Sequence, residues 1–241
     1  MILCLDCGNS RLKWGLHNDG GWLASGALLH AEIARLAEQL PVDCMPQDVL
    51  GCNVAGIARA GQIEAALCRP VNWITAKDVQ CGVINGYDTP ASFGADRWAA
   101  LIGAHALHSG PALVVLAGTA TTIDVLDADG RHQGGLILPG INLMASLLAT
   151  GTAGLPQACG DYRLLPCNTH DAIISGAIQA TLGAIERMFR AIPSGTNTVC
   201  LLSGGAAEAL QAHLGMPCRR IDHLVMEGLV CIAAGQSSNP A

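Results

Sequence analysis

The chain has 241 residues, enough for one large domain or two small ones, and its 51% hydrophobic and 13% charged residues exclude a disordered protein. The net charge of -6 and the scattering of the 13 basic residues disfavour nucleic-acid binding, which needs a cationic surface. The sequence predicts neither a signal peptide nor a membrane span, and its 11 cysteines, several within apolar runs, predict free thiols and a cytoplasmic location.

The first half of the chain predicts strands followed by helices. A Gly8-Asn9 turn joins the first two strands as a hairpin. The predicted strands are Met1–Leu5, Arg11–His17, Trp22–Leu29, Val49–Val54 and Val71–Thr75, and the predicted helices are Ala31–Leu40, Gly56–Cys68 and Phe93–His108.

The second half repeats this order. Its predicted strands are Ala112–Leu116, Thr122–Leu126, His132–Leu138 and Thr198–Leu202, and its predicted helices are Pro139–Ala149, Thr169–Ala191, Ala206–Leu214 and Val225–Gln236. Because Leu3–Asn9 aligns with Leu113–Thr119, we expect a duplicated α/β domain with a cleft between the copies. The expected domains are residues 1–110 and 111–221, with the C-terminal helix, residues 222–241, packing back on the first domain.

The strongest local motif is Asp6–Lys13. Gly8 allows close backbone approach to a phosphate, Lys13 can neutralise negative charge, and Asp6 can hold a hydrated Mg²⁺. On its own, an ordinary hairpin turn with a surface lysine explains the motif equally well.

A second motif, Gly118–Asp124, follows the first strand of the second half. Its small hydroxylated residues can surround a phosphate, and Asp124 adds a carboxylate near a metal, although a plain threonine-rich strand would look similar. A strand and turn with an acidic residue in each half is the phosphate-binding layout of actin-like ATPases. Neither a Walker A motif nor a protein-kinase glycine loop occurs in the sequence.

Further candidates are polar residues in loops. Tyr87 precedes Gly94-Ala95-Asp96-Arg97, where Asp96 can accept a proton from an attacking hydroxyl and Arg97 can bind an anionic substrate group. Gly204-Gly205 follows a strand, where backbone can approach a nucleotide, but an ordinary turn is an equal alternative. Cys4 and Cys7 form a CxxC without a second pair, so zinc binding is not expected.

Together these motifs resemble the type III pantothenate kinases. That family carries DxGNSRxKW, GxDR, GTAxTID, GGxIxPG and an NT pair, in that order. The matching segments here are Asp6–Trp14, Gly94–Arg97, Gly118–Asp124, Gly134–Gly140 and Asn168-Thr169, which span most of the chain.

The resemblance implies an α/β fold of two duplicated ribonuclease-H-like (actin-like) domains, each a mixed sheet flanked by helices, with the nucleotide cleft between them. It also implies a homodimer with active sites at the interface. The implied reaction transfers the γ-phosphate of ATP to the hydroxyl of pantothenate, which is the first step of coenzyme A synthesis.

The same resemblance assigns roles to residues. Asp96 is the implied catalytic base. The implied pantothenate site contains Tyr87, Gly94, Ala95, Asp96, Arg97 and Thr169. The implied ATP site contains Asp6, Cys7, Gly8, Asn9, Ser10, Arg11, Leu12, Lys13 and Thr119, and Mg²⁺ would be held through water by Asp6 and Asp124.

One position departs from the family pattern. The family has an aspartate two residues before the glycine of GTA, where it binds a monovalent cation such as K⁺ or NH₄⁺, and this chain has Leu116 there. Two alternative functions stay open: another actin-fold small-molecule kinase or polyphosphatase, and a non-catalytic regulator of the transcriptional accessory type.

Overall fold

The computed structural model describes residues 1–41, 46–193 and 197–237, which form two compact units. The first unit comprises Met1–Ser109, Asp129–His132 and the segment that begins at His223; the second comprises Gly110–Ala128 and Gln133–Asp222. Across the described ranges, no helix combines the length and the apolar character that crossing a membrane would require.

The first unit contains a five-stranded mixed sheet in the order β3-β2-β1-β4-β5. Its central strand β1 pairs antiparallel with β2 and parallel with β4. The strands are β1 (Ile2–Cys7), β2 (Arg11–Asn18), β3 (Gly21–Leu29), β4 (Asp48–Asn53) and β5 (Asn72–Trp73). The continuous apolar run in β1 is explained by this central position, which buries both of its faces.

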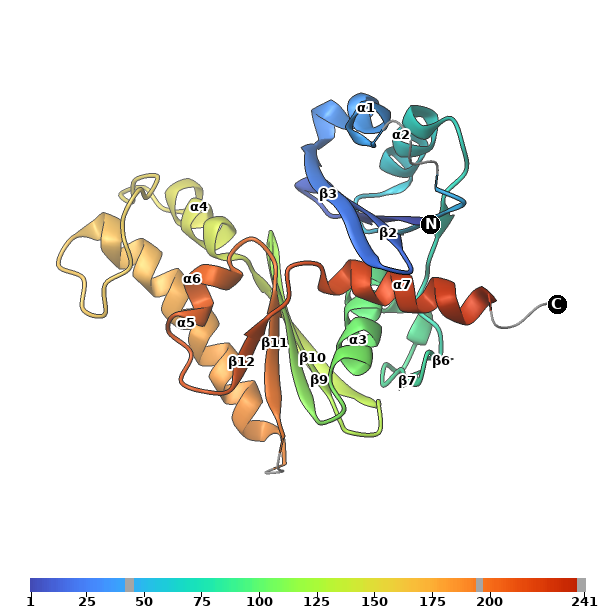
Figure 1. The fold of residues 1–241 in the computed structure, drawn as a ribbon. Coiled ribbons are helices and arrows are strands. Elements are labelled where there is room, and N and C mark those ends of the chain that lie inside the picture. The colour runs from blue at the N-terminus through green and yellow to red at the C-terminus, as the bar shows by residue number, and fades with distance from the viewer. Residues whose placement is uncertain (42–45, 194–196, 238–241) are drawn as a thin grey trace. The chain divides into compact units, whose positions relative to one another are not determined.

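Helices cover the sheet of the first unit. They are α1 (Leu36–Gln39), α2 (Ile57–Leu67), α3 (Ala95–Leu107) and α7 (Leu224–Ser237). The C-terminal helix α7 runs beside α3 (Figure 1). A side chain on Gly228 would collide with the carbonyl group of Ala99, and one on Gly103 would lie 2.5 Å from the carbonyl oxygen of Leu224. Glycine at these two positions therefore permits the close packing of α3 and α7.

Two local features of the first unit differ from the prediction. The segment expected to form one helix, Ala31–Leu40, is a 3-10 helix, η1 (His30–Arg35), followed by the single turn of α1. Its buried residues Ile33 and Leu36 are three apart, a spacing that a 3-10 helix places on one face. The hairpin of β6 (Val79–Gln80) and β7 (Val83–Ile84) was not predicted, because two-residue strands have no measurable periodicity.

The second unit repeats the topology of the first, with the strand order β10-β9-β8-β11-β12. Its central strand β8 pairs antiparallel with β9 and parallel with β11. The elements are β8 (Ala112–Ala117), β9 (Ala120–Leu126), β10 (His132–Pro139), α4 (Ile141–Gly151), α5 (Thr169–Ala191), β11 (Val199–Ser203), α6 (Ala207–Gln211) and β12 (Cys218–Arg220). The predicted α/β class with two mixed sheets flanked by helices is confirmed.

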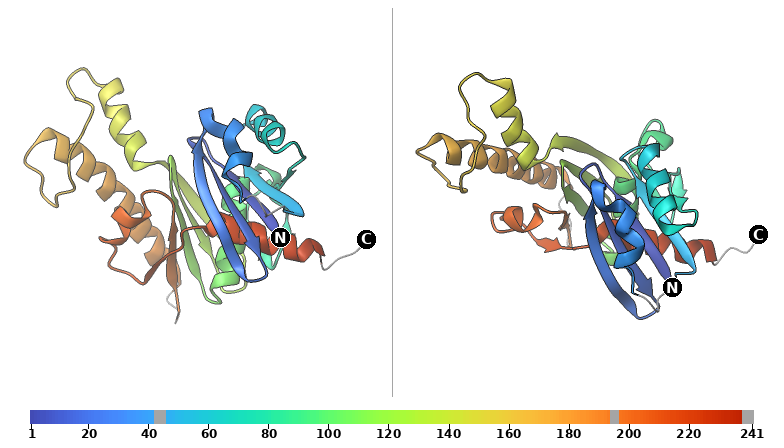
Figure 2. Two further views of the ribbon diagram at one scale, coloured as in Figure 1. Left: turned by 45° about the horizontal axis from the view of Figure 1, so that its top comes forward. Right: turned by 90° about the horizontal axis from the view of Figure 1, so that it is seen from above.

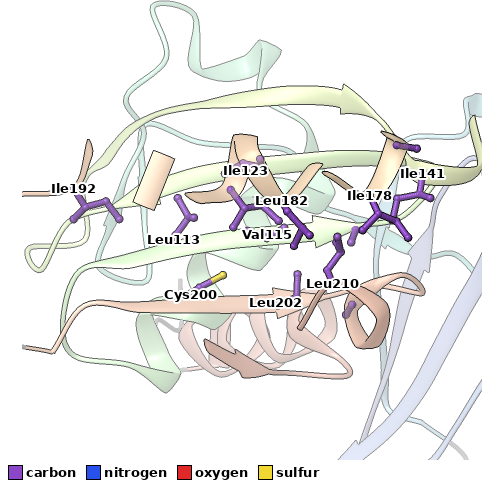
Figure 3. Packing of buried hydrophobic residues seen from close by; sticks show 14 residues of the cluster. Leu113, Val115, Ile123, Ile141, Ile178, Leu182, Ile192, Cys200, Leu202 and Leu210 are labelled. Atoms are coloured by element: carbon purple, nitrogen blue, oxygen red, sulfur yellow. The ribbon is translucent and has the colours of Figure 1, made fainter. Parts of the chain in front are cut away.

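A buried cluster joins the second sheet to α5 and α6. Figure 3 shows side chains from β8, β9 and β11 meeting those of the helices, and the labelled members are Leu113, Val115, Ile123, Ile141, Ile178, Leu182, Ile192, Cys200, Leu202 and Leu210. The 23-residue helix α5 has the predicted bounds. It begins there because the Asn168 side chain caps it by accepting a hydrogen bond from the backbone N–H of Asp171 at 2.9 Å. Figure 2 shows α4 beside α5 in both of its views.

Candidate active site

In the first unit, Asp6 and Lys13 lie directly opposite each other on β1 and β2. The Lys13 Nζ is 3.8 Å from the Asp6 Oδ2. The Asp6 side chain is 13% exposed and that of Lys13 is 42% exposed, so both can still meet a ligand. The predicted hairpin thus places a carboxylate and an ammonium group next to the Gly8 turn.

The pKa of Asp6 is raised to about 6, because burial and, to a smaller extent, the Asp96 carboxylate outweigh the lowering effect of Lys13. Although 90 residues of sequence separate Asp6 from Asp96, the start of α3 lies beside the Asp6 strand end, because Cys52, the β4 partner of Asp6, donates to the Ala95 carbonyl oxygen. A site that holds two neighbouring carboxylates is suited to a cationic ligand and to acid–base chemistry.

The turn that joins β1 to β2 presents backbone and polar side chains. The Gly8 N–H donates to the Arg11 carbonyl oxygen at 3.2 Å, which closes the turn. The side chains of Asn9, Ser10 and Arg11 are exposed. Two predicted ATP-site residues, Cys7 and Leu12, instead bury their side chains completely in the core of the first unit. Cys7 and Leu12 can therefore offer a ligand only their backbone.

Asp96 lies in the first turn of α3, whose N-cap is Gly94. Its Oδ1 accepts a hydrogen bond from the backbone N–H of Arg97 at 2.8 Å. Carboxylates are stabilised at helix N-termini, where N–H groups and the helix dipole face them. The carbonyl of the preceding residue, Ala95, accepts a hydrogen bond from the buried thiol of Cys52 at 3.3 Å. Because Cys52 is the β4 neighbour of Asp6, this contact ties the start of α3 to the edge of the sheet where Asp6 lies.

The structure brings Tyr87 and Arg97 together. The Arg97 Nη1 donates to the Tyr87 hydroxyl at 2.8 Å, and Arg97 is only 4% exposed. Its guanidinium carbon lies 4.4 Å from the ring centroid of Phe93. A buried guanidinium requires such partners, since an unpaired buried charge is costly.

Phe93 and His132 complete this cluster and were not predicted from the sequence. The ring centroids of Phe93 and His132 are 4.9 Å apart, and those of Tyr87 and Phe93 are 4.5 Å apart. A side chain on Gly86 would collide with the His132 carbonyl group, so the loop that carries Tyr87 needs glycine there. The chain has only two phenylalanines and two tyrosines, and this rarity was the sequence feature that could have pointed to Phe93. No sequence feature indicated His132, which begins β10 after the β8–β9 pair.

In the second unit, three predicted glycine segments meet at one turn. The Gly118 N–H donates to the Ala120 carbonyl oxygen at 3.0 Å, and the Gly140 N–H donates to that of Thr119 at 2.9 Å. Gly204 has a φ of +106°, and a side chain there would lie 2.4 Å from the Ala117 carbonyl oxygen. Gly140 and Gly204 thus pack against the β8–β9 turn and the strand end before it, while Thr119 itself stays exposed.

Asp124 and Leu116 share one face of the second sheet, because they lie at alternate positions on β9 and β8. Asp124 is buried, and its carboxylate lies against the backbone of Gly135. Leu116 pairs with Thr122 on β9 and with Ser203 on β11. The buried Thr122 Oγ1 has no hydrogen-bond partner within the described part of the chain.

Thr169, the first residue of α5, borders an apolar groove of about 820 Å³ between α4 and α5. The groove is lined by Met144, Leu147, Leu148, Leu155, Pro166, Cys167, Asn168, Thr169, Ala172, Ile173, Gly176 and Ala177. Leu147 is 51% exposed and Leu148 is 39% exposed. An exposed apolar surface of this kind is typical of a protein interface.

The structure gives no support to a zinc site at the CxxC. Cys4 and Cys7 are three positions apart on β1, so their side chains point to opposite faces of the sheet. In the ranges that the structure describes, no three His, Cys, Asp or Glu side chains gather to hold a metal. A hydrated Mg²⁺ remains compatible with the site, since Mg²⁺ keeps several waters and uses one or two carboxylates together with substrate phosphates.

Sequence comparison connects the chain to named relatives. A family model described as type III pantothenate kinase matches residues 2–191. A type III pantothenate kinase of Aromatoleum aromaticum is 53% identical over 237 residues, covering 97% of this chain and 98% of the relative. One from Dechloromonas aromatica is 47% identical over 232 residues, covering 95% of this chain and 97% of the relative.

Structural comparison finds the same fold in distant proteins. A Campylobacter jejuni protein assigned to the Baf family of transcriptional activators has a TM-score of 0.65 at 20% identity, covering 98% of this chain and 100% of its own. A Sinorhizobium meliloti protein assigned as a 2-dehydro-3-deoxygalactonokinase has a TM-score of 0.59 at 15% identity, with both chains fully covered. At these identities the likeness shows the fold alone, which is that of the actin-like ATPases and sugar kinases.

Proposed function

The chain belongs to the type III pantothenate kinase family and phosphorylates pantothenate for coenzyme A biosynthesis, and from this premise we propose how its residues divide the reaction. The observation that carries the assignment of roles is the grouping of Asp6, Lys13 and Asp96 in the first unit. The regulator alternative finds no support among the curated relatives, which are named as kinases.

Asp96 is the general base of the proposed mechanism. It accepts the proton of the pantothenate hydroxyl as that oxygen attacks the γ-phosphorus of ATP and the bond to the ADP oxygen breaks. Its place in the first turn of α3 keeps the carboxylate fixed, since the Arg97 N–H donates to its Oδ1 at 2.8 Å.

The Asp6–Lys13 hairpin holds the ATP phosphates. Lys13 offsets the negative charge that develops on the phosphates during transfer, and backbone N–H groups near Gly8 bind phosphate oxygens. Thr119 contributes a second phosphate contact from the turn of the second unit. Asp6 and Asp124 hold Mg²⁺ through water, and the ion supplies charge neutralisation when it is bound. The carboxylate of Asp6 suits this role because Lys13, 3.8 Å away, leaves most of its acceptor capacity free.

Pantothenate lies against Tyr87 and the Gly94–Arg97 segment in this proposal. Arg97 holds the Tyr87 hydroxyl at 2.8 Å and brings positive charge to the site of an anionic substrate. Thr169 contributes from the start of α5. Because Thr169 borders the apolar groove, a second subunit docked there would complete the substrate site.

The functional unit is proposed to be a homodimer. The α4–α5 groove, with Leu147 and Leu148 exposed, gives an apolar surface for a second copy of the chain. A monovalent cation is not assigned a role, since Leu116 cannot ligate K⁺ or NH₄⁺. The cytoplasmic location stays a prediction.

A substrate panel tests the proposal against another actin-fold kinase. Purified protein with ATP and Mg²⁺ is offered pantothenate, a hexose, glycerol and polyphosphate, and ADP release is measured. ADP release that depends on pantothenate alone is expected. Release with a sugar or polyphosphate, and none with pantothenate in a folded sample, would replace the proposed acceptor.

A further inference from the structure

A pair of thiols lies in the second unit, apart from the residues given roles above. Cys200 on β11 and Cys218 on β12 are directly paired in register on neighbouring parallel strands. Side chains of paired residues on parallel strands point to the same face of the sheet. Cys200 belongs to the buried cluster, next to Leu202 on the same strand (Figure 3). Cys218 packs against that cluster and is half-buried.

The two thiols contact each other. The Cys200 thiol and the Cys218 sulfur form a side-chain hydrogen bond, which lowers the pKa of Cys218 and raises that of Cys200. Neighbouring strands lie about 4.8 Å apart, which is within the Cα separation that a disulfide spans. The backbone supports this register, because the Cys200 N–H donates to the Pro217 carbonyl oxygen at 2.9 Å.

Cys218 and Cys200 differ in solvent access, which sets the order in which the two thiols react. Cys218 is only half-buried and lies at the start of the three-residue edge strand β12, which gives it more solvent access than Cys200. Cys200 is fully buried within the hydrophobic cluster, so solvent does not reach it. Thiolate character and exposure together decide which cysteine is oxidised first.

We propose that Cys218 and Cys200 form a peroxide-reactive thiol pair that closes to an intramolecular disulfide. The Cys218 thiolate attacks the O–O bond of hydrogen peroxide, giving a sulfenic acid and releasing hydroxide. The sulfur of Cys200 then attacks the Cys218 sulfur, and the sulfenic oxygen leaves as water. The two thiols lose two electrons and two protons, and one peroxide becomes two waters. This inference does not depend on the kinase assignment.

The position of the pair gives the disulfide a structural consequence. β11 continues from Cys200 to Ser203, and the following Gly204 packs against the carbonyl of Ala117. A link between β11 and β12 would therefore fix the strand whose end packs against Ala117, the last residue of β8 before its turn to β9.

Mass spectrometry of the whole protein tests the proposal. Both cysteines fall in one tryptic peptide, residues 191–219, because no Lys or Arg lies between them. After treatment with hydrogen peroxide and alkylation of free thiols, we expect this peptide to be unalkylated and lighter by two hydrogen atoms. Dithiothreitol should restore alkylation of both cysteines.

Single substitutions separate the two roles. Cys200→Ser should leave a Cys218 sulfenic acid that dimedone traps, and Cys218→Ser should leave Cys200 reduced. Cys68→Ser, which removes an exposed cysteine of the other unit, should leave the disulfide unchanged. The proposal is overturned if wild-type peptide 191–219 stays fully alkylated while exposed cysteines are oxidised, or if Cys218 pairs with a different cysteine.

Discussion

Lys13 faces Asp6 across the first hairpin, with its Nζ 3.8 Å from the Asp6 Oδ2. Burial nevertheless raises the pKa of Asp6 to about 6, so the ammonium group only partly offsets the cost of burying the carboxylate. The hairpin therefore keeps a carboxylate that titrates close to neutral pH at the proposed phosphate site.

The first prediction concerns the pH dependence of ATP use. If ionised Asp6 is needed for the metal-bound nucleotide, kcat/KM for ATP should fall as pH drops below about 6, the pKa of Asp6 in the free enzyme. Lys13→Gln should move this acid limb to higher pH, because Lys13 lowers the Asp6 pKa. Steady-state rates from pH 5 to 8 measure the acid limb in the wild type and in Lys13→Gln. An acid limb that stays in place in Lys13→Gln would show that another group sets it.

Asp6→Asn should stabilise the fold at neutral pH. The folded-state pKa of Asp6, about 6, lies above its ordinary value of 3.8, so the folded protein binds more protons than the unfolded chain between these values. Stability therefore falls as pH rises through this window. Removing the charge should raise the free energy of unfolding by about 1–3 kcal/mol at pH 7.

Urea unfolding at pH 7 and at pH 5 measures the effect of Asp6→Asn, and the gain should shrink at the lower pH. Asp19→Asn, at an exposed turn of the same sheet, provides the matched control and should change the free energy of unfolding little. Equal stability of Asp6→Asn and wild type at pH 7 would contradict the raised pKa.

Particular residues show what could be predicted from the sequence. The capped, periodic α5 was predicted with its true bounds, and the Asp6–Lys13 hairpin was predicted as a hairpin. The resemblance placed Tyr87 and Arg97 in one substrate site, but the hydrogen bond between them was not predicted. Contacts such as those of Phe93 with His132 depend on tertiary packing between segments distant in sequence, which leaves no periodic pattern. The same holds for Cys52, whose thiol bonds to the start of α3.

Leu116 should make the enzyme independent of monovalent cations. Rates in Na⁺, K⁺ and NH₄⁺ salts of equal ionic strength should be similar, because leucine offers a hard cation no oxygen. Leu116→Asp should fold, since the unpartnered Thr122 Oγ1 opposite can donate to the new carboxylate, and it should acquire activation by K⁺. A large activation of the wild type by K⁺ over Na⁺ would show that other groups form a cation site.

Leu147→Glu should dissociate the proposed dimer. A charge in the α4–α5 groove would be desolvated by a docked second copy, so sedimentation should show a monomer, and pantothenate turnover should fall with it. Ile57→Glu, at a residue 90% exposed in the first unit, serves as the control and should leave the oligomeric state and the turnover unchanged. A monomeric wild type with full activity would remove the interface from the proposal.

The most direct test compares wild type and Asp96→Asn in forming 4′-phosphopantothenate from ATP and pantothenate. The substitution keeps the shape of the side chain and removes the base, so turnover should fall by about 100-fold to 10,000-fold. ATP affinity, measured by calorimetry, should stay unchanged, because the proposed phosphate contacts come from Asp6–Lys13 and Thr119. Wild-type product with this loss in Asp96→Asn is the predicted result. Near-normal turnover by Asp96→Asn would remove Asp96 from the mechanism, and a folded wild type that forms no product would contradict the assigned reaction.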